Sequence, residues 1–144
     1  MKGEDERMQE GERIRLTGRS IYPRIGQGQA LVTKMNISFF VGVDPESGLV
    51  LERDHELQRQ SLAGVVLVFS AGKGSTVGSY TLYRLKKAGL APAAIVDIEC
   101  KTITAVGCII AEIPCVDQVT IERIPSGMMV VVDGNSGSVE VQFR

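Results

Sequence analysis

The chain has 144 residues, enough for one domain that hides about two-thirds of the surface of its unfolded form. Its 16 Lys and Arg against 17 Asp and Glu give a formal net charge of −1, so there is no basic field to attract nucleic acid or anionic lipid. Aromatic residues make up 5% and Trp is absent, which argues against a base-stacking surface. We therefore expect neither nucleic acid nor a membrane as a partner.

Segment 1–12 is charged and rich in acidic residues, the opposite of the apolar stretch of a signal peptide. The longest apolar run near the middle of the chain, Val65–Phe69, is far too short to span a bilayer. These features predict a short solvated N-terminal arm at 1–12, a single domain at 13–144 and a cytoplasmic location.

The first third of the domain is predicted to be strands and turns. Alternating residues indicate a strand at 13–21 followed by a turn, and segment 29–43 is typical of two strands with a break between them. Asp44 and Pro45 then start a turn, although Asp44 and the nearby Ser38 would also suit the lining of a cleft. The polar stretch 49–64 is expected to be a surface connection in which His55 is solvated.

The middle of the chain predicts a β-α-β unit over 65–99. A continuous β-branched run at 64–70 fits a strand buried on both faces, and a second such strand is expected at 91–99. Between them, residues 77–90 have helical spacing, with Gly89 at the C-terminal cap position. The inward face of this helix is predicted to carry Val77, Tyr80, Leu82, Tyr83 and Leu85.

A second, largely buried helix is expected at 102–113, ended by Pro114. Short strands are then predicted at 116–122, 128–134 and 139–144. Strands, one crossover unit and strands again predict an α/β domain with a mixed sheet. Its helices should cover one side of the sheet while the other side packs on a β-layer.

Three cysteines, Cys100, Cys108 and Cys115, lie close together in the sequence. Their spacings are C-x7-C and C-x6-C, with no CxxC pair and no nearby His, and their flanks are apolar. Because a free cysteine packs as a small hydrophobe, we interpret them as buried and inert rather than as metal ligands.

The stretch GKGST, Gly72–Thr76, resembles a phosphate loop at first sight. A Walker A loop would need Gly at Leu67 and a hydroxyl at Gly74, so the motif is excluded. What remains is a glycine turn that leads into a helix N-terminus, where successive N–H groups favour an anion. Ser75 is then either the helix cap or a functional hydroxyl, and the residues alone leave both readings open. Beside Lys73 and backbone donors its alkoxide would be favoured, so it could accept a proton.

The pattern as a whole resembles the small subunit of the aconitase X family. The resemblance rests on the stretches GQGQALVT, ISFFVGVDPESG, SLAGVVLVFSAGKGSTVGSY, GLAPAAIVDIE and ITAVGCIIAEIPCVD, which span roughly residues 26–117. It implies a swivelling β/β/α domain and a larger aconitase-like partner subunit that carries a 4Fe-4S cluster, with no metal or cofactor in this chain.

For archaeal members, the resemblance implies dehydration of (R)-5-phosphomevalonate to trans-anhydromevalonate 5-phosphate in isoprenoid synthesis. It also implies that Ser75 is the proton acceptor. By charge and position, we then expect Lys73, Gly74 and Thr76 to shape the pocket for the small phosphorylated carboxylate. Two alternatives stay open: the small subunit of a cis-3-hydroxy-L-proline dehydratase, and a non-catalytic regulatory module that binds an anion at the same turn.

Overall fold

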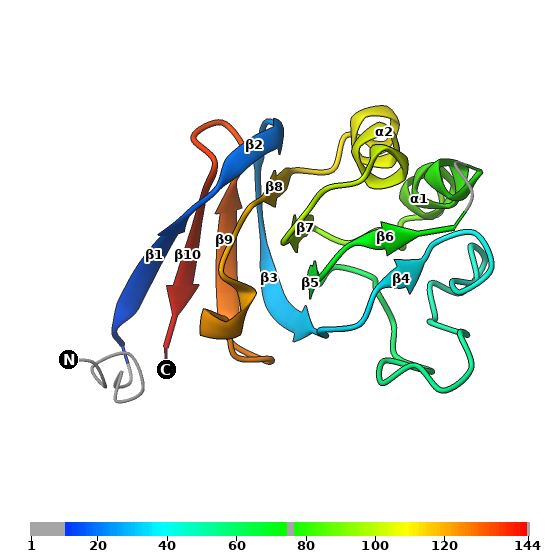
Figure 1. Ribbon diagram of the computed structural model, residues 1–144, viewed down its shortest axis with the longest axis horizontal. Coiled ribbons are helices and arrows are strands. Elements are labelled where there is room, and N and C mark those ends of the chain that lie inside the picture. Colours follow the sequence, from blue (N-terminus) through cyan, green and yellow to red (C-terminus); the bar gives the residue numbers. More distant parts are fainter. Residues whose placement is uncertain (1–10, 75–76, 144) are drawn as a thin grey trace.

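The computed structural model describes residues 11–74 and 77–143, so the arm predicted at 1–12 lies almost wholly outside the described part. In that part the chain forms ten strands, two α-helices and a short 3-10 helix, η2 (Ile121–Arg123) (Figure 1). The strands are β1 (Arg13–Thr17), β2 (Arg19–Tyr22), β3 (Ile25–Val32), β4 (Ile37–Ser38), β5 (Val66–Phe69), β6 (Gly72–Lys73), β7 (Ala94–Asp97), β8 (Cys115–Asp117), β9 (Met129–Asp133) and β10 (Ser138–Gln142). The helices are α1 (Gly78–Lys87) and α2 (Thr102–Ala111).

Eight of these strands form one sheet in the order β1-β10-β9-β3-β5-β7-β8-β2, and β4 pairs with β6 in a small separate sheet. Strands β3, β5, β7 and β8 are parallel, whereas the neighbours on either side of them pair antiparallel. Only Gly18 separates β1 from β2, although these strands lie at opposite edges of the sheet. The sheet therefore curves until its two edges approach each other at Gly18.

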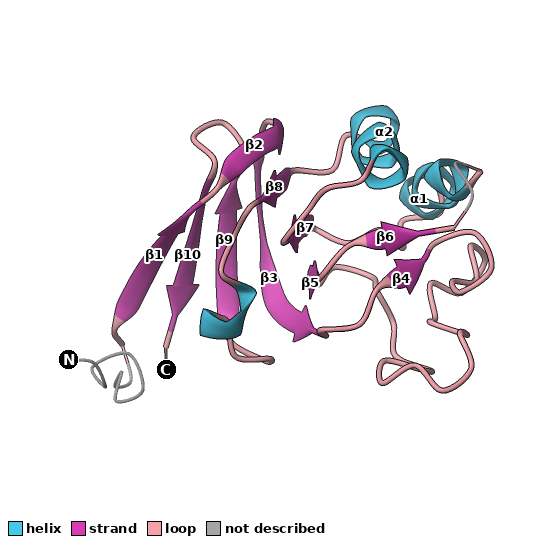
Figure 2. Ribbon diagram, in the orientation of Figure 1, coloured by secondary structure: helices cyan, strands magenta, loops and turns pink. Residues whose placement is uncertain are grey.

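Two hydrophobic clusters divide the molecule into three layers (Figure 2). The first fills the space between the antiparallel strands and the inner face of the parallel strands, and it includes Leu16, Val66, Val68, Val96, Val130 and Val139. The second lies between the outer face of the parallel strands and the helices, and it includes Phe39, Leu67, Phe69, Leu82 and Ile95. The mixed α/β fold with helices on one side and a β-layer on the other is thus confirmed.

The β-α-β unit is confirmed as well, because β5 and β7 are adjacent and parallel and α1 connects them. The face that α1 buries was predicted only in part. Leu82 and Leu85 are fully buried, but Val77, Tyr80 and Tyr83 are exposed. The buried face instead includes Ser79, whose Oγ donates to the Ile103 carbonyl oxygen at 2.7 Å, so a polar contact with α2 sets the orientation of the helix.

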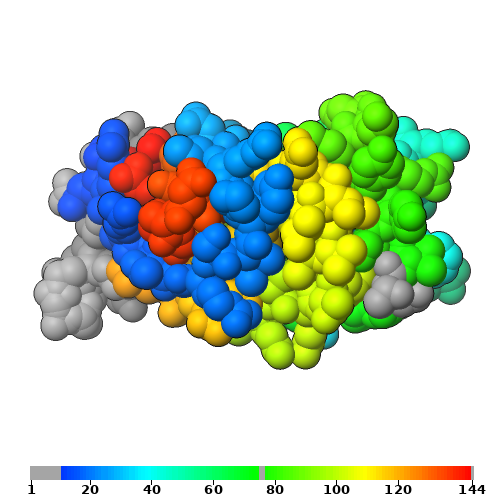
Figure 3. Space-filling model, turned by 90° about the horizontal axis from the view of Figure 1, so that it is seen from above, coloured from blue at the N-terminus to red at the C-terminus, as the bar shows by residue number. Residues whose placement is uncertain are grey.

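Two further expectations were wrong in detail. The strand expected at 116–122 ends at Asp117, and the chain continues into η2. Helix α2 is less buried than expected, since Val106, Ile109 and Ile110 are exposed on its outer side. In Figure 3, α2 (yellow) lies between the green α1 segment and the blue and orange-red strands, which leaves its outer side open.

The prediction for His55 was also wrong: the imidazole is buried, with 3% of the residue exposed. Nδ1 accepts the Leu57 N–H at 3.0 Å, so Nε2 carries the proton and donates to the Asn36 carbonyl oxygen at 3.0 Å. His55 therefore anchors the 49–64 connection to the residue that precedes β4.

Within the described residues, no helix is long and apolar enough to cross a membrane.

Candidate functional site

The glycine turn follows β6, which pairs in parallel with β4 through Ile37 opposite Gly72 and Ser38 opposite Lys73. Gly74 comes next, with a φ of +96°. This backbone conformation is strained for residues with a side chain, but glycine adopts it readily. The chain re-enters the described part at Val77, and α1 begins at Gly78. Gly72 and Lys73, which were expected to belong to the turn, therefore form a short strand, whereas the helix expected after the turn is present.

Close packing fixes the backbone at both ends of the turn. A Cβ on Gly72 would lie 2.3 Å from Thr104 Oγ1 on α2, and a Cβ on Gly74 would lie 3.1 Å from Ser38 Oγ on β4. A Cβ on Gly78 would lie 2.8 Å from the end of the Ile103 side chain. The absence of side chains here lets β4 and α2 hold the turn from two directions.

Lys73 is anchored by a carboxylate that the sequence analysis did not single out. Its Nζ lies 2.6 Å from Glu52 Oε2, and the lysine and glutamate side chains are 46% and 20% exposed. The other oxygen, Glu52 Oε1, accepts the Ser38 N–H at 3.4 Å. Glu52 comes from the irregular 49–64 connection, and no sequence spacing relates it to the turn.

A cavity of about 360 Å³ opens beside the turn, and its lining residues are Gly72, Lys73, Gly74, Lys101, Thr102 and Ile103. Lys101 is the N-cap residue of α2, and the first turn of that helix contains no acidic residue. The positive end of the α2 dipole and two lysines therefore border the cavity, which favours an anionic ligand. Each lysine also has a carboxylate neighbour, since Lys101 Nζ lies 3.1 Å from Glu99 Oε1.

Of the predicted site residues, the structure brings Lys73 and Gly74 to this cavity, while Ser75 and Thr76 lie outside the described residues. Ser38 packs against Gly74. Asp44 acts as the turn initiator, because its carboxylate accepts the Glu46 N–H at 3.0 Å and the Ser47 hydroxyl at 2.7 Å. Both hydrogen bonds lower the pKa of Asp44, and the bond from the Ser47 hydroxyl has the larger effect.

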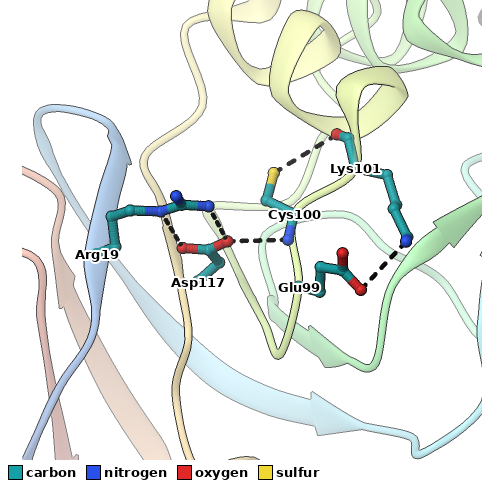
Figure 4. Close-up of polar contacts among 5 residues, drawn as sticks. All are labelled: Arg19, Glu99, Cys100, Lys101 and Asp117. Carbon is teal, nitrogen blue, oxygen red and sulfur yellow. Dashed lines mark hydrogen bonds and ion pairs between the residues drawn. The ribbon is translucent and has the colours of Figure 1, made fainter.

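A second polar group lies at the carboxyl ends of β7 and β8 (Figure 4). The buried Asp117 carboxylate accepts two hydrogen bonds from the Arg19 guanidinium, at 3.0 and 2.8 Å, and one from the Cys100 N–H at 3.0 Å. Cys108 and Cys115 are buried as expected, but Cys100 is only half-buried. Cys108 and Cys115 belong to the hydrophobic cluster beneath the helices, whereas the backbone of Cys100 joins the polar group around Asp117.

The comparisons with known proteins identify the family. The model of the aconitase X swivel domain matches residues 15–141. The chain belongs to this family. The phosphomevalonate dehydratase small subunit of Thermococcus kodakarensis is 47% identical over 128 residues, which are 89% of this chain and 96% of the relative. Its counterpart in Methanothrix thermoacetophila is 50% identical over 124 residues, 80% of this chain and 90% of the relative.

Solved structures support the same assignment. A crystal structure of Thermococcus kodakaraensis aconitase X in its holo-form matches with a TM-score of 0.87 at 47% identity, covering 89% of this chain and 98% of that one. A second structure, determined by solution NMR, matches with a TM-score of 0.80 at 45% identity over the same shares. The three layers described above are therefore those of an aconitase X swivel domain.

Proposed function

We propose that this chain is the small subunit of a two-subunit hydro-lyase that dehydrates (R)-5-phosphomevalonate to trans-anhydromevalonate 5-phosphate. The observation that carries the proposal is the 47% identity to the Thermococcus kodakarensis phosphomevalonate dehydratase small subunit over 89% of this chain and 96% of the relative. A relative named as a small subunit implies a large one, so the active species contains a large aconitase-like chain. We place this enzyme in the cytoplasm.

In this reaction Ser75 removes the proton from the carbon next to the substrate carboxylate. The C–H electron pair forms the double bond as the C–O bond on the neighbouring carbon breaks. The hydroxide that leaves and the proton taken by Ser75 together make up the water that is lost. A serine becomes a base only where its alkoxide is stabilised by positive charge and hydrogen-bond donors. The Lys73 ammonium and the α2 dipole at the adjoining cavity are such groups, and they support the role.

The substrate carries a phosphate and a carboxylate, and the 360 Å³ cavity beside the turn has a lining suited to one of them. We propose that Lys73 and the Gly74 backbone, with Thr76, bind that anionic group. Lys101, which also lines the cavity, is a second cation that the sequence analysis missed. Its position at the start of α2 is the only signal that could have indicated it.

A 4Fe-4S cluster in the large subunit would supply the Lewis acid that takes the leaving hydroxyl. In the described part of this chain only two cysteine thiols, those of Cys100 and Cys115, come together in a group of potential metal ligands, fewer than the thiolates that hold such a cluster. The contribution of this chain is therefore to hold the base and the anionic end of the substrate.

The test is an assay of the complex reconstituted with the large subunit and its cluster. We expect turnover of phosphomevalonate and none of cis-3-hydroxy-L-proline. The reverse preference would assign the chain to the proline dehydratase. A stable complex that turns over neither compound would favour a non-catalytic module that binds anions.

Replacing Ser75 by Ala should lower kcat by at least about 10²-fold, because a positioned general base contributes about 10²–10⁴-fold to such a step. The matched control is Ser70→Ala, since the Ser70 hydroxyl donates to the Lys34 carbonyl oxygen at 2.6 Å and is given no catalytic role. The measurement is steady-state dehydration by the intact complex. Near-normal turnover in Ser75→Ala would refute the assignment of the base.

A further inference from the structure

Asp97, the last residue of β7, is a buried carboxylate without a partner. None of the residue is exposed, and neither Oδ1 nor Oδ2 has a hydrogen-bond partner in the described part of the chain. Burial, followed by the nearby Asp117 carboxylate, raises the pKa of Asp97 to about 8. Buried polar groups are almost always hydrogen-bonded, so a fully enclosed carboxyl of this kind indicates that something binds there.

Two thiols are next to this carboxylate. A carboxylate oxygen of Asp97 and the Sγ atoms of Cys100 and Cys115 all lie within 4.8 Å of one another. Cys115 begins β8, which pairs in parallel with β7, so the topology of the sheet brings it beside Asp97. Cys100 belongs to the short loop that leads from β7 to α2. Three ligand atoms from two strands and one loop therefore converge under the start of α2.

The loop that carries Cys100 is held by its backbone rather than by its thiol. The Cys100 N–H donates to Asp117 Oδ2 at 3.0 Å, and Arg19 binds the same carboxylate from outside (Figure 4). The thiol itself makes a long contact of 3.8 Å to the Lys101 carbonyl oxygen and interacts with the neighbouring Cys115 thiol. Cys100 Sγ can therefore turn toward Asp97 and Cys115 without breaking the contacts that position the loop.

We propose that Asp97, Cys100 and Cys115 bind a single thiophilic divalent cation, for which Zn²⁺ is the best fit. Two thiolates and one carboxylate are typical zinc ligands, and ligand atoms on a tetrahedral Zn²⁺ with ~2.3 Å bonds to sulfur lie about 3.8 Å apart. The three ligand atoms lie at most 4.8 Å apart, so each pair must approach by about 1 Å at most to bind the ion. Small side-chain rotations are enough for this. Cys100 is the most exposed of the three ligands, so its side is the one from which the ion and a fourth ligand, such as water, would approach.

The ion would supply the missing partner of Asp97, while the Arg19 guanidinium, bound to Asp117 at the edge of the group, offsets part of the remaining negative charge. Binding of this kind stabilises the folded chain, because the ligands converge only in the native state. The inference is independent of the dehydratase reaction. A different use of the same two thiols, a Cys100–Cys115 disulfide, is an outcome that the test below separates.

The test uses the full-length chain, reduced, freed of metal and titrated with Co²⁺ as a spectroscopic substitute for Zn²⁺. We expect one Co²⁺ per chain, with a thiolate-to-cobalt charge-transfer band and the visible bands of tetrahedral Co²⁺, both removed by added Zn²⁺. Cys100→Ala and Cys115→Ala should weaken binding by more than about tenfold, since loss of even an outer-sphere partner costs about 10–100-fold. Asp97→Asn should weaken binding but keep the thiolate band.

Cys108→Ala is the matched control, because Cys108 is a buried cysteine of the same core that lies outside the ligand group, and it should bind Co²⁺ as the wild type does. Circular dichroism and thermal melting of each variant check the fold. If Cys115→Ala does not fold, Cys100→Ala still decides the test, because the half-buried Cys100 can be replaced with less disturbance of the core. The proposal is overturned if the reduced wild type shows no thiolate band at saturating Co²⁺, or if Cys108→Ala weakens binding as much as Cys100→Ala. It is also overturned if peptide mapping finds a Cys100–Cys115 disulfide and the reduced protein binds no cobalt.

Discussion

At the scale of single residues, the ion pair between Lys73 and Glu52 decides what the lysine can contribute. The 2.6 Å contact orients the ammonium at the rim of the cavity, and with the lysine side chain 46% exposed, one side of the group stays open to a ligand. A lysine held in this way loses less side-chain entropy when it binds an anion than a freely moving one. It also gives a weaker field than an unpaired cation, because Glu52 cancels part of its charge.

We therefore expect Lys73→Gln to raise KM for phosphomevalonate by about tenfold, the lower end for loss of a charge-assisted hydrogen bond, with little change in kcat. The measurement is steady-state kinetics of the reconstituted complex. Lys86→Gln, on the exposed last turn of α1, is the matched control and should leave both constants unchanged. A fall in kcat at constant KM would instead assign Lys73 to stabilisation of the Ser75 alkoxide.

Which residues the sequence could predict depends on whether their partners are local. The turn role of Asp44 was predictable because both partners, Glu46 and Ser47, lie within three positions. Glu52 and His55 were not predictable, since each contacts the β4 region across 14 and 19 positions of the chain, respectively. The proximity of Asp97 to Cys115 likewise requires the pairing of β7 with β8, which no spacing in the sequence contains.

At the scale of elements, the packing of β6 against α2 positions the turn. Gly72→Ala would drive a methyl group to 2.3 Å from Thr104 Oγ1, and overpacking of this kind costs about 1–3 kcal/mol of unfolding free energy. Thr104 Oγ1 is buried and has no hydrogen-bond partner in the described residues, so Thr104→Ala alone should be close to neutral.

The double variant Gly72→Ala/Thr104→Ala should then recover most of the lost stability, as measured by urea unfolding of all four proteins. Additive effects in this cycle would contradict the close contact. The cycle also tests the site, because Gly72→Ala should depress dehydration in the complex and the second substitution should restore it.

The elements themselves were mostly visible in the sequence, whereas their orientation was not. The bounds of α1 and α2 follow from apolar spacing and from the glycine and proline that end them. The face of α1 was mispredicted because spacing assigns aromatic residues to the core, whereas small and polar residues allow the closer approach to α2. Ser79 donates to Ile103, and a Cβ on Gly107 would lie 2.5 Å from the Leu82 side chain.

At the scale of the whole molecule, the sheet order places strands that are consecutive in sequence at opposite edges, as with β1 and β2. Local patterns predict strands but not this order, which explains why the fold class could be inferred and the curved sheet could not. The elements that form the candidate site, β4, β6 and the start of α2, all lie toward the same end of the molecule (Figure 1). A site confined to one end is suited to closure by a second subunit.

The surface beside the turn carries the apolar side chains that such a subunit would cover. Val41 is 73% exposed and Tyr80 is 64% exposed. They belong to the same region, because a Cβ on Gly78 would lie 3.1 Å from the Phe40 backbone nitrogen. Exposed apolar groups around a functional turn are typical of an interaction surface, and large side chains at its centre contribute most of the binding energy.

We therefore expect Val41→Asp and Tyr80→Asp each to weaken assembly with the large subunit by at least about tenfold, since hot-spot losses commonly exceed 1 kcal/mol. The measurement is the dissociation constant of the purified subunits, with circular dichroism to verify the fold of each variant. Ile109→Asp is the control: this residue is equally apolar and 51% exposed, but it lies on the outer side of α2. If Ile109→Asp abolishes assembly while the other two do not, the large subunit covers α2 instead, which would contradict the proposed role of the Ser75 turn.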